Sequence, residues 1–403
     1  MAAHMKRHLA RLLTVSVSSL IATAGAADIN VWSHLDGPEL AWLKIQATNF
    51  ETVYGHHVVI TSAKFDVMRD KFIADAPKGL APDLLVTQPQ DRISAFVDAK
   101  VIEPMDRYVT NKDDLLKVAV DAMTYQGRMY AVPMYAETVA LVYNKALVPT
   151  PPASWDALVR AAQNDVQRGR GGLIVDVANA YMTFGVTSAF GGYVFKNNGG
   201  KLDVNNIGIA NDGAVRAARA LADLRLGSRV VPATYDGGAA RKQFFDGKAA
   251  FFVTGPWDMG EIKRSGLDFG IMPMPAPTGA TGKWRPFVGV QGIMMNAYSK
   301  QKSVAAQFAT FLASEGAQVS FGKTSASIPV SSAALDKMRA DPVLSAFTQI
   351  VKGGISMPNV REMGDVWGPW QDALKEATTK PGADVAKILA DAEKTIRASF
   401  KKK

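Results

Sequence analysis

The 403-residue sequence contains no cysteine. Disulfide bonds, thiolate metal sites, iron–sulfur clusters and a cysteine nucleophile are therefore excluded. Histidine is also scarce, with five in the whole chain. The pair His56-His57 comes just before a predicted strand, where neighbouring side chains point to opposite faces, so the two rings do not form a metal site. We therefore predict that the protein uses no metal and no other cofactor.

Several motifs and patterns are missing as well. No glycine-rich phosphate loop and no G-x-S-x-G turn follows a predicted strand, so nucleotide binding and an α/β-hydrolase site have no support. Lysine and arginine are spread along the chain rather than concentrated, which argues against nucleic-acid binding. Carboxyl groups are plentiful, and a pair of them could serve a glycosidase. An enzyme therefore remains as a minority alternative.

The N-terminal segment 1–26 has the pattern of a secretory signal peptide. Basic residues precede an apolar run at 12–21, and Ala24-Gly25-Ala26 matches an A-x-A cleavage site. The segment holds three basic residues and no acidic one, so its removal lowers the net charge from +9 to +6. No cysteine follows for lipid attachment, and no later apolar run approaches a membrane-spanning length. The sequence predicts a soluble periplasmic protein that begins near Ala27.

The rest of the chain predicts an α/β protein. Its length and its 48% hydrophobic content suit two lobes with sizeable cores. Strand-like runs at 28–33, 57–60 and 82–86 alternate with helix-like stretches, which is a βαβαβ opening. Such units form largely parallel sheets and bind ligands in the loops beyond the carboxyl ends of their strands.

Two apolar runs are fit to carry the chain from one sheet into another, at Thr138–Tyr143 and at Phe287–Met295. These crossings, together with a third bound at 337/338, make each lobe discontinuous. We expect a cleft at the hinge between the lobes, and we expect each lobe to be a sheet flanked by helices. The predicted bounds are 27–136 with 292–337 for the N-lobe, and 137–291 with 338–403 for the C-lobe.

Tryptophan stands out at two places. The turn Gly255-Pro256-Trp257 joins the strand-like run 249–253 to a helix-like segment, where an α/β domain forms its ligand crevice. Near the C-terminus, Trp367 and Trp370 are three residues apart and share a helix face. Each could instead be a packing residue, Trp257 tucked under a helix and the pair as one buried stripe. On the residues alone both interpretations stay open.

These pieces together resemble a known family, the bacterial periplasmic solute-binding proteins of ATP-dependent sugar importers, and most closely those that bind maltose and maltodextrin. The resemblance covers essentially the whole chain after the signal peptide, and its blocks also match in order and spacing. The strongest blocks are Ala136–Lys145 with the proline-rich stretch and Trp155 that follow, Gly191–Lys196, Gly255–Trp257, Pro286–Val290 and Met357–Asn359. The resemblance implies the two-lobed periplasmic binding protein fold of type II.

The resemblance also implies a set of sugar-binding residues. Trp257, Trp367 and Tyr181 would contact the apolar faces of the sugar rings, because such rings can cover C–H groups. The polar positions are Asp36, Asp91, Arg92, Glu137, Asn179 and Gln371. Asn179 and Gln371 stand where the family has a glutamate and an arginine.

Two more departures remove groups that the family uses. Gly37 replaces a lysine, and a tryptophan that precedes Asp91 is replaced within 87–90. Because each charge-assisted hydrogen bond contributes on the order of 1.5–3 kcal/mol, affinity and preferred sugar can both differ from the family's pattern.

The function implied is capture, not catalysis. We expect a monomer that binds maltose- or maltodextrin-type α-glucosides by lobe closure and delivers them to the membrane permease of an ABC importer. A different disaccharide such as trehalose, or a polyamine, remains an alternative ligand, and a secreted glycoside hydrolase is a more remote one.

Overall fold

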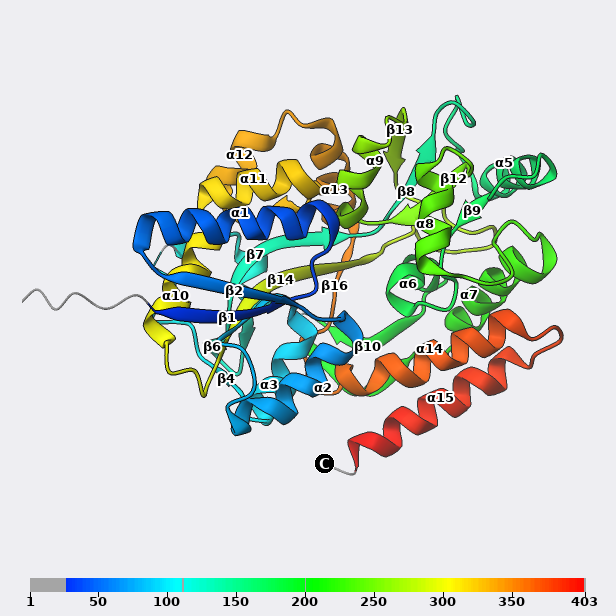
Figure 1. The fold of residues 1–403 in the computed structure, drawn as a ribbon. Helices are drawn as coiled ribbons and strands as arrows, with labels where there is room; N and C mark the ends of the chain where they lie inside the picture. Colours follow the sequence, from blue (N-terminus) through cyan, green and yellow to red (C-terminus); the bar gives the residue numbers. More distant parts are fainter. Residues whose placement is uncertain (1–26, 111, 200, 402–403) are drawn as a thin grey trace, which may run out of the picture.

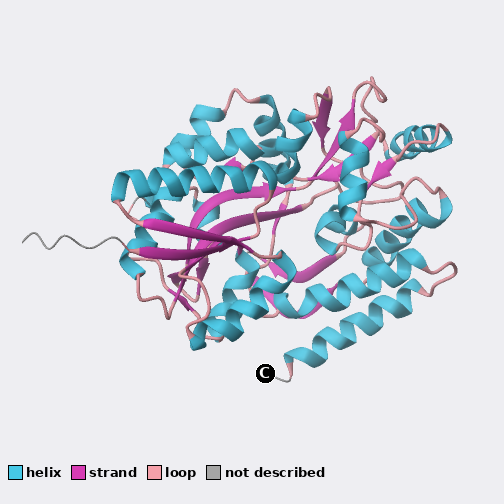
Figure 2. Ribbon diagram, viewed as in Figure 1, coloured by secondary structure: helices cyan, strands magenta, loops and turns pink. Residues whose placement is uncertain are grey.

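Two sheets organise the chain in the computed structural model, which describes residues 27–110, 112–199 and 201–401. The larger has eight strands and the smaller has four, and helices cover both (Figures 1 and 2). The predicted signal peptide lies outside the described residues. Within them, no helix is long and apolar enough to cross a membrane.

The larger sheet has the order β15-β7-β14-β3-β1-β2, and β4 and β16 pair with β14. β1 is parallel to both β2 and β3, which confirms the predicted βαβαβ opening, whereas β14 is antiparallel to β3 and β7. The carboxyl ends of β1, β2 and β3 therefore lie at one edge. The strand bounds are β1 (Asp28–Ser33), β2 (His57–Ser62), β3 (Leu84–Pro89), β4 (Ile102–Glu103), β7 (Ala131–Thr138), β14 (Phe287–Asn296), β15 (Ile328–Pro329) and β16 (Ile355–Ser356).

The smaller sheet has the order β13-β8-β12-β9. Its strands are β8 (Ala140–Asn144), β9 (Leu173–Ile174), β12 (Phe251–Thr254) and β13 (Phe269–Met272). β9 is short, and soon after it the Asp176 side chain accepts a hydrogen bond from the Ala178 N–H and begins a turn. Two antiparallel pairs complete the strands, β5 (Thr124–Tyr125) with β6 (Arg128–Met129) and β10 (Tyr193–Asn198) with β11 (Lys201–Gly208).

The chain crosses directly from one sheet to the other after Thr138. β7 ends there in the larger sheet, and β8 begins at Ala140 in the smaller one, as the run 138–143 predicted. The second predicted run, 287–295, forms β14 and lies wholly in the larger sheet, so the return crossing comes just before it. The Thr138 hydroxyl donates to the Phe287 carbonyl over 2.7 Å, which holds the two connections together.

Helices pack on both sheets, and local signals set their ends. α1 is followed by Gly55 in the left-handed conformation with φ of +72°, which favours glycine. The Ser154 hydroxyl caps α5 by accepting from the Ala157 N–H. The helices are α1 (Gly37–Tyr54), α2 (Phe65–Asp75), α3 (Ile93–Asp98), α4 (Lys117–Ala122), α5 (Trp155–Gln167), α6 (Ala180–Ala189), α7 (Asp212–Ala222), α8 (Gly237–Phe245), α9 (Met259–Arg264), α10 (Lys302–Leu312), α11 (Glu315–Ser325), α12 (Ser332–Met338), α13 (Pro342–Gly353), α14 (Met363–Thr379) and α15 (Val385–Phe400).

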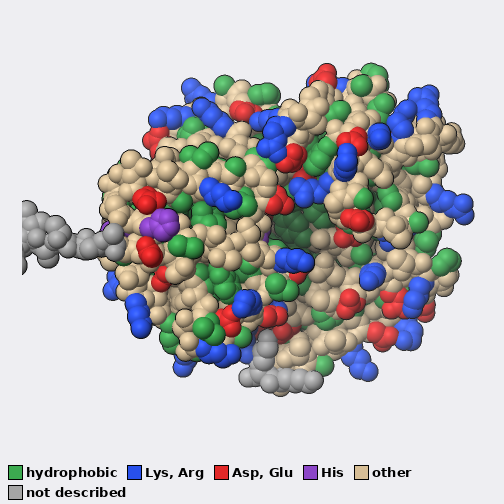
Figure 3. All heavy atoms as spheres, in the orientation of Figure 1, with side chains coloured by type: hydrophobic (Ala, Val, Ile, Leu, Met, Phe, Trp, Pro, Cys, Tyr) green, Lys and Arg blue, Asp and Glu red, His purple; other side chains and the backbone are tan. Residues whose placement is uncertain are grey.

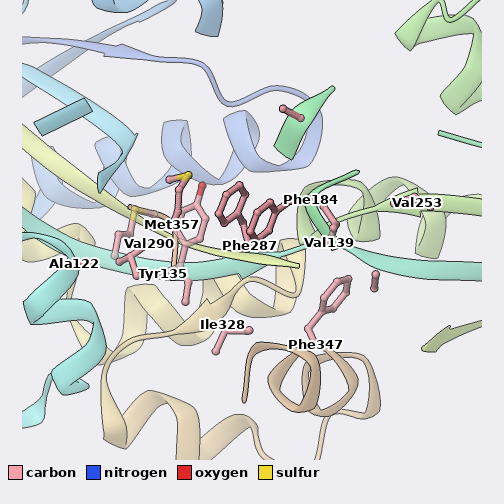
Figure 4. Close-up of a cluster of buried hydrophobic side chains, with 14 of the residues drawn as sticks. Ala122, Tyr135, Val139, Phe184, Val253, Phe287, Val290, Ile328, Phe347 and Met357 are labelled. Atoms are coloured by element: carbon pink, nitrogen blue, oxygen red, sulfur yellow. The ribbon is translucent and has the colours of Figure 1, made fainter. Parts of the chain in front are cut away.

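The buried apolar side chains form one cluster that extends across both sheets. Near the crossing point, Phe184 of α6 and Phe287 of β14 stack with ring centres 3.5 Å apart and an interplanar angle of 2° (Figure 4). Both rings are buried, and Trp370 of α14 meets Phe184 edge-on. The core thus supports the region where the two sheets meet.

Candidate functional site

The Gly-Pro-Trp turn lies between β12 and α9 and forms a short 3-10 helix, η5 (Pro256–Asp258). The Trp257 ring lies back over Gly255, where an added Cβ would stand 2.3 Å from two ring atoms. Glycine is therefore required by this close approach. Below the ring, the buried Asp258 accepts from Thr254 and pairs with Arg241. These contacts of Asp258 fix the turn, and the indole stays half-buried.

Tyr181 of α6 continues the aromatic surface from Trp257. Its ring centre is 6.4 Å from that of Trp257 and 6.2 Å from that of Phe287, and Phe287 is 6.0 Å from Trp367 of α14. Four rings from four elements therefore form a row. The Tyr181 hydroxyl is buried and has no hydrogen-bond partner among the described residues. Burial, followed by the Glu137 carboxyl, raises the pKa of Tyr181 well above 10, so the hydroxyl stays protonated.

Glu137 lies on β7, one residue before its end, and faces the Tyr181 hydroxyl across Gly289 of β14. An added Cβ at Gly289 would stand 3.5 Å from the Glu137 Cγ and 3.6 Å from the Tyr181 Oη. The Gln291 side-chain amide donates to Glu137 Oε1 over 2.6 Å. Burial raises the pKa of Glu137 to about 7, and the Gln291 hydrogen bond opposes this shift.

This shift makes stability depend on pH. Between 4.5 and about 7 the folded protein keeps a proton on Glu137 that the unfolded chain loses, so stability falls as pH rises through this window, by at most about 1.4 kcal/mol per unit. Glu137→Gln cannot ionise, and it should gain stability relative to the native protein from pH 5 to 7.5. Urea unfolding at several pH values measures the difference. A difference that stayed constant with pH would contradict the assignment.

A hydrogen bond between Asp91 and Trp367 links two segments that are far apart in the sequence. The Trp367 indole N–H donates to Asp91 Oδ2 over 2.7 Å, although the residues are 276 positions apart. Asp91 lies in η2 (Gln90–Arg92) after β3 and is only 8% exposed, and its Oδ1 is buried without a partner among the described residues. Burial raises the pKa of Asp91, and the neighbouring Arg92 opposes this effect. An unsatisfied buried acceptor beside an aromatic ring is suited to a hydroxyl donor.

Arg92 points into the protein. Its guanidinium donates to Gln88 Oε1 and to the Phe65 carbonyl, both over 3.0 Å, and lies 3.6 Å from the centre of the Phe65 ring. Burial lowers the pKa of Arg92 to about 10, so it stays charged at neutral pH. Arg92 thus holds Gln88 and Phe65 in place next to Asp91.

The other three predicted polar residues occupy different places. Asp36 precedes α1 and is exposed, with its Oδ2 3.9 Å from Arg241 Nη1. Asn179 caps α6, since its Oδ1 accepts from the N–H groups of Tyr181 and Met182. Gln371 is half-buried on α14, one turn after Trp367. Asp91, Glu137 and the aromatic residues therefore form the central group, and these three lie around it.

Sequence reasoning missed two charged residues of this region. Glu39 of α1 is 6% exposed, and burial, followed by Glu137 and Asp36, raises its pKa well above 4.5. Arg241 of α8 lies between Asp36 and Asp258 and so connects the start of α1 to the Trp257 turn. Glu39 stands three residues after Asp36 in the first turn of α1, and this spacing could have indicated Glu39 from the sequence. Nothing in the local sequence marked Arg241.

The surface view agrees with a recessed site. Figure 3 shows a hollow near the centre of the face drawn, with apolar side chains at its floor and acidic and basic side chains around it. Among the described residues, no group of three or more histidine, aspartate or glutamate side chains could hold a metal ion. Separately, aromatic rings beside polar groups with spare hydrogen-bonding capacity, as at Asp91 and Tyr181, are suited to a small organic ligand.

Two sheets joined by crossing strands, with such a site where they meet, define a two-lobed binding protein. The sequence comparison gives the family: the chain belongs to the bacterial extracellular solute-binding proteins, whose sequence model matches residues 36–319. A maltotriose-binding protein of Pyrococcus abyssi is 30% identical over 388 residues, with 93% of this chain and 83% of that protein covered. A maltodextrin-binding protein of Bacillus subtilis is 25% identical over 389 residues, covering 89% and 91%.

Solved structures agree with the fold. The Thermus thermophilus maltotriose-binding protein, bound with maltotriose, is 40% identical with a TM-score of 0.89, covering 92% of this chain and 100% of that one. The maltose-maltodextrin binding protein of Alicyclobacillus acidocaldarius is 29% identical with a TM-score of 0.84, covering 92% and 100%. The predicted two-lobed α/β fold is confirmed, and the family is one of solute-binding proteins, not of enzymes.

Proposed function

We propose that this protein binds maltotriose and related maltodextrins and delivers them to the permease of an ABC importer. The observation that carries the proposal is the set of partly exposed rings Trp257, Tyr181 and Trp367 beside the buried carboxyl group of Asp91 and the partly buried one of Glu137. Two relatives are named for binding maltotriose and maltodextrin, which supports the ligand class. Another is named as the solute-binding lipoprotein of a maltooligosaccharide ABC transporter, which supports the importer.

The chemistry of a glucan matches this surface. The C–H faces of glucose rings would cover Trp257 and Trp367, and their hydroxyls would bond to the unpartnered oxygens of Asp91 and Tyr181 and to Glu137. In this proposal Asp36, Arg92, Asn179 and Gln371 border the bound sugar or hold its walls in place. A polyamine fits less well, because burial raises the pKa values of Asp91 and Glu137 and so disfavours the charged carboxylates that a cation needs.

In this proposal both lobes contribute residues to the site, so a bound sugar would favour lobe closure. We assign 27–136 with 292–337 to the N-lobe and 137–291 with 338–403 to the C-lobe, with the bound at 291/292 inside β14, which runs through the hinge. Asp91 and Trp367 then stand on opposite lobes. A sugar that touches both lobes stabilises the closed form, since only a ligand with different affinities for the two forms shifts their equilibrium. The protein would act as a periplasmic monomer, and the closed form would dock on the permease.

Intrinsic tryptophan fluorescence tests the ligand class. Purified protein is titrated with maltose, maltotriose, trehalose, a galactooligosaccharide and spermidine, the fourth because a Bacillus subtilis relative that is 25% identical is named for galactooligosaccharides. We expect maltotriose to change the signal at micromolar concentration, because its rings would cover Trp257 and Trp367. A response to spermidine or to the galactooligosaccharide, with none to any α-glucoside at millimolar concentration, would refute the proposal.

A further inference from the structure

An aromatic side chain outside the predicted set lies at the same edge of the larger sheet. Phe65 begins α2, after the carboxyl end of β2, and is 39% exposed. β2 is parallel to β1, and β1 is parallel to β3, so the loop before Phe65 shares this edge with the segments that carry Asp36 and Asp91. Phe65 therefore lies at the sheet edge that also carries two residues of the candidate site.

The Phe65 ring is held in place although it is exposed. The buried Arg92 guanidinium covers one side of it at 3.6 Å from the ring centre, and the same guanidinium donates to the Phe65 carbonyl over 3.0 Å. The His34 ring is 4.9 Å away at 70°. Burial, followed by Arg92, lowers the pKa of His34 to about 4, so this neighbour stays uncharged at neutral pH. A fixed ring can contact a ligand without a large loss of side-chain entropy.

Core packing does not account for this position. Phe65, Met68 and Phe72 follow helix spacing, but only Met68 and Phe72 are fully buried, and Phe65 lies past the end of that apolar face. The Arg92 guanidinium, and not the core, therefore holds this ring in place.

The segment just before Asp91 offers no aromatic side chain at this place. The segment 87–90, which the family resemblance matched to a tryptophan, is polar apart from its proline, and Thr87, Gln88 and Gln90 are all fully buried. Phe65 reaches the same neighbourhood from another element, because Arg92 beneath it adjoins Asp91, which in turn bonds to Trp367.

We infer that Phe65 is an N-lobe stacking surface for one further glucose unit of a maltodextrin, at the end of the site next to Asp91, and that it sets the chain-length preference. The inference rests on the proposed function. Its chemistry is that of the C-lobe rings, an apolar face that covers the C–H groups of a pyranose. The added unit would lie beyond those held between Trp257 and Trp367, so short sugars would not reach it.

Calorimetric titration of maltose, maltotriose and maltotetraose into native protein, Phe65→Ala and Phe65→Trp tests this. Val67→Ala is the matched control, because Val67 lies on the same helix and is 56% exposed. We expect Phe65→Ala to weaken the longest sugar that binds by about tenfold and maltose by less than about twofold. Phe65→Trp should restore the preference, and Val67→Ala should match the native protein.

Each other outcome has a distinct meaning. Equal weakening of all three sugars by Phe65→Ala would show that the ring only supports Arg92, and no weakening would show that it touches no sugar; either result overturns the inference and leaves the proposed function intact. If the native protein bound none of the three sugars, the proposed function would fail, and this inference would fail with it.

Discussion

Trp257→Ala should lower the affinity for maltotriose by about 30- to 100-fold. The substitution removes an indole that is half-buried in the free protein and, in the proposed complex, fully covered by a sugar ring. Burying an aromatic side chain contributes roughly 2–2.7 kcal/mol, which corresponds to that change in dissociation constant. Calorimetric titration at constant pH measures it directly.

The same variant should remain folded, because the turn is anchored by the side chain of Asp258 and not by the indole. We expect its melting temperature to fall by only a few degrees. Trp155→Ala is the matched control: Trp155 begins α5 and is 7% exposed, so its loss should destabilise the fold and leave the affinity of the folded fraction unchanged. A collapse of the melting transition in Trp257→Ala would show that this indole is a core residue.

Trp367→Ala should have the largest effect on binding, about 100-fold or more. It removes a ring of the aromatic row, and it leaves the buried Asp91 carboxyl without the indole N–H that donates to it. The neighbouring Trp370→Ala should instead lower stability and leave the sugar affinity of the folded protein unchanged. Trp370 is 1% exposed and packs against Phe184, so its removal should cost about 3–5 kcal/mol of stability.

The two variants separate ligand contact from packing on one helix, since the tryptophans are three residues apart in α14. Denaturant unfolding and sugar titration of both give the comparison. If Trp367→Ala bound maltotriose as the native protein does, Trp367 would not line the site. If both variants lost mainly stability, the interpretation of the pair as one packing stripe would be correct for both residues.

The sequence predicted the fold well because its signals are local. Gly55 ends α1, Ser154 caps α5, and the Gly-Pro-Trp turn places Trp257 between a strand and a helix. The run after Thr138 likewise predicted the crossing between sheets. Each of these features follows from a few neighbouring residues.

The site was only partly predictable, because its properties depend on contacts between distant segments. The hydrogen bond from Trp367 to Asp91 spans 276 positions. The position of Arg241 between Asp36 and Asp258 depends on how two lobes pack, and the raised pKa of Glu137 depends on burial that no local pattern shows. The pairing of Phe65 with Arg92 also joins two segments that are adjacent only in the folded protein.

A crystal structure of the protein with maltotriose would test the central claim most directly. The account predicts a glucose ring against Trp257 and another against Trp367, with carbon atoms within about 4 Å of each indole, and sugar hydroxyls bonded to Asp91 and Glu137. Sugar bound at another surface, or within the hollow but away from both indoles, would contradict it.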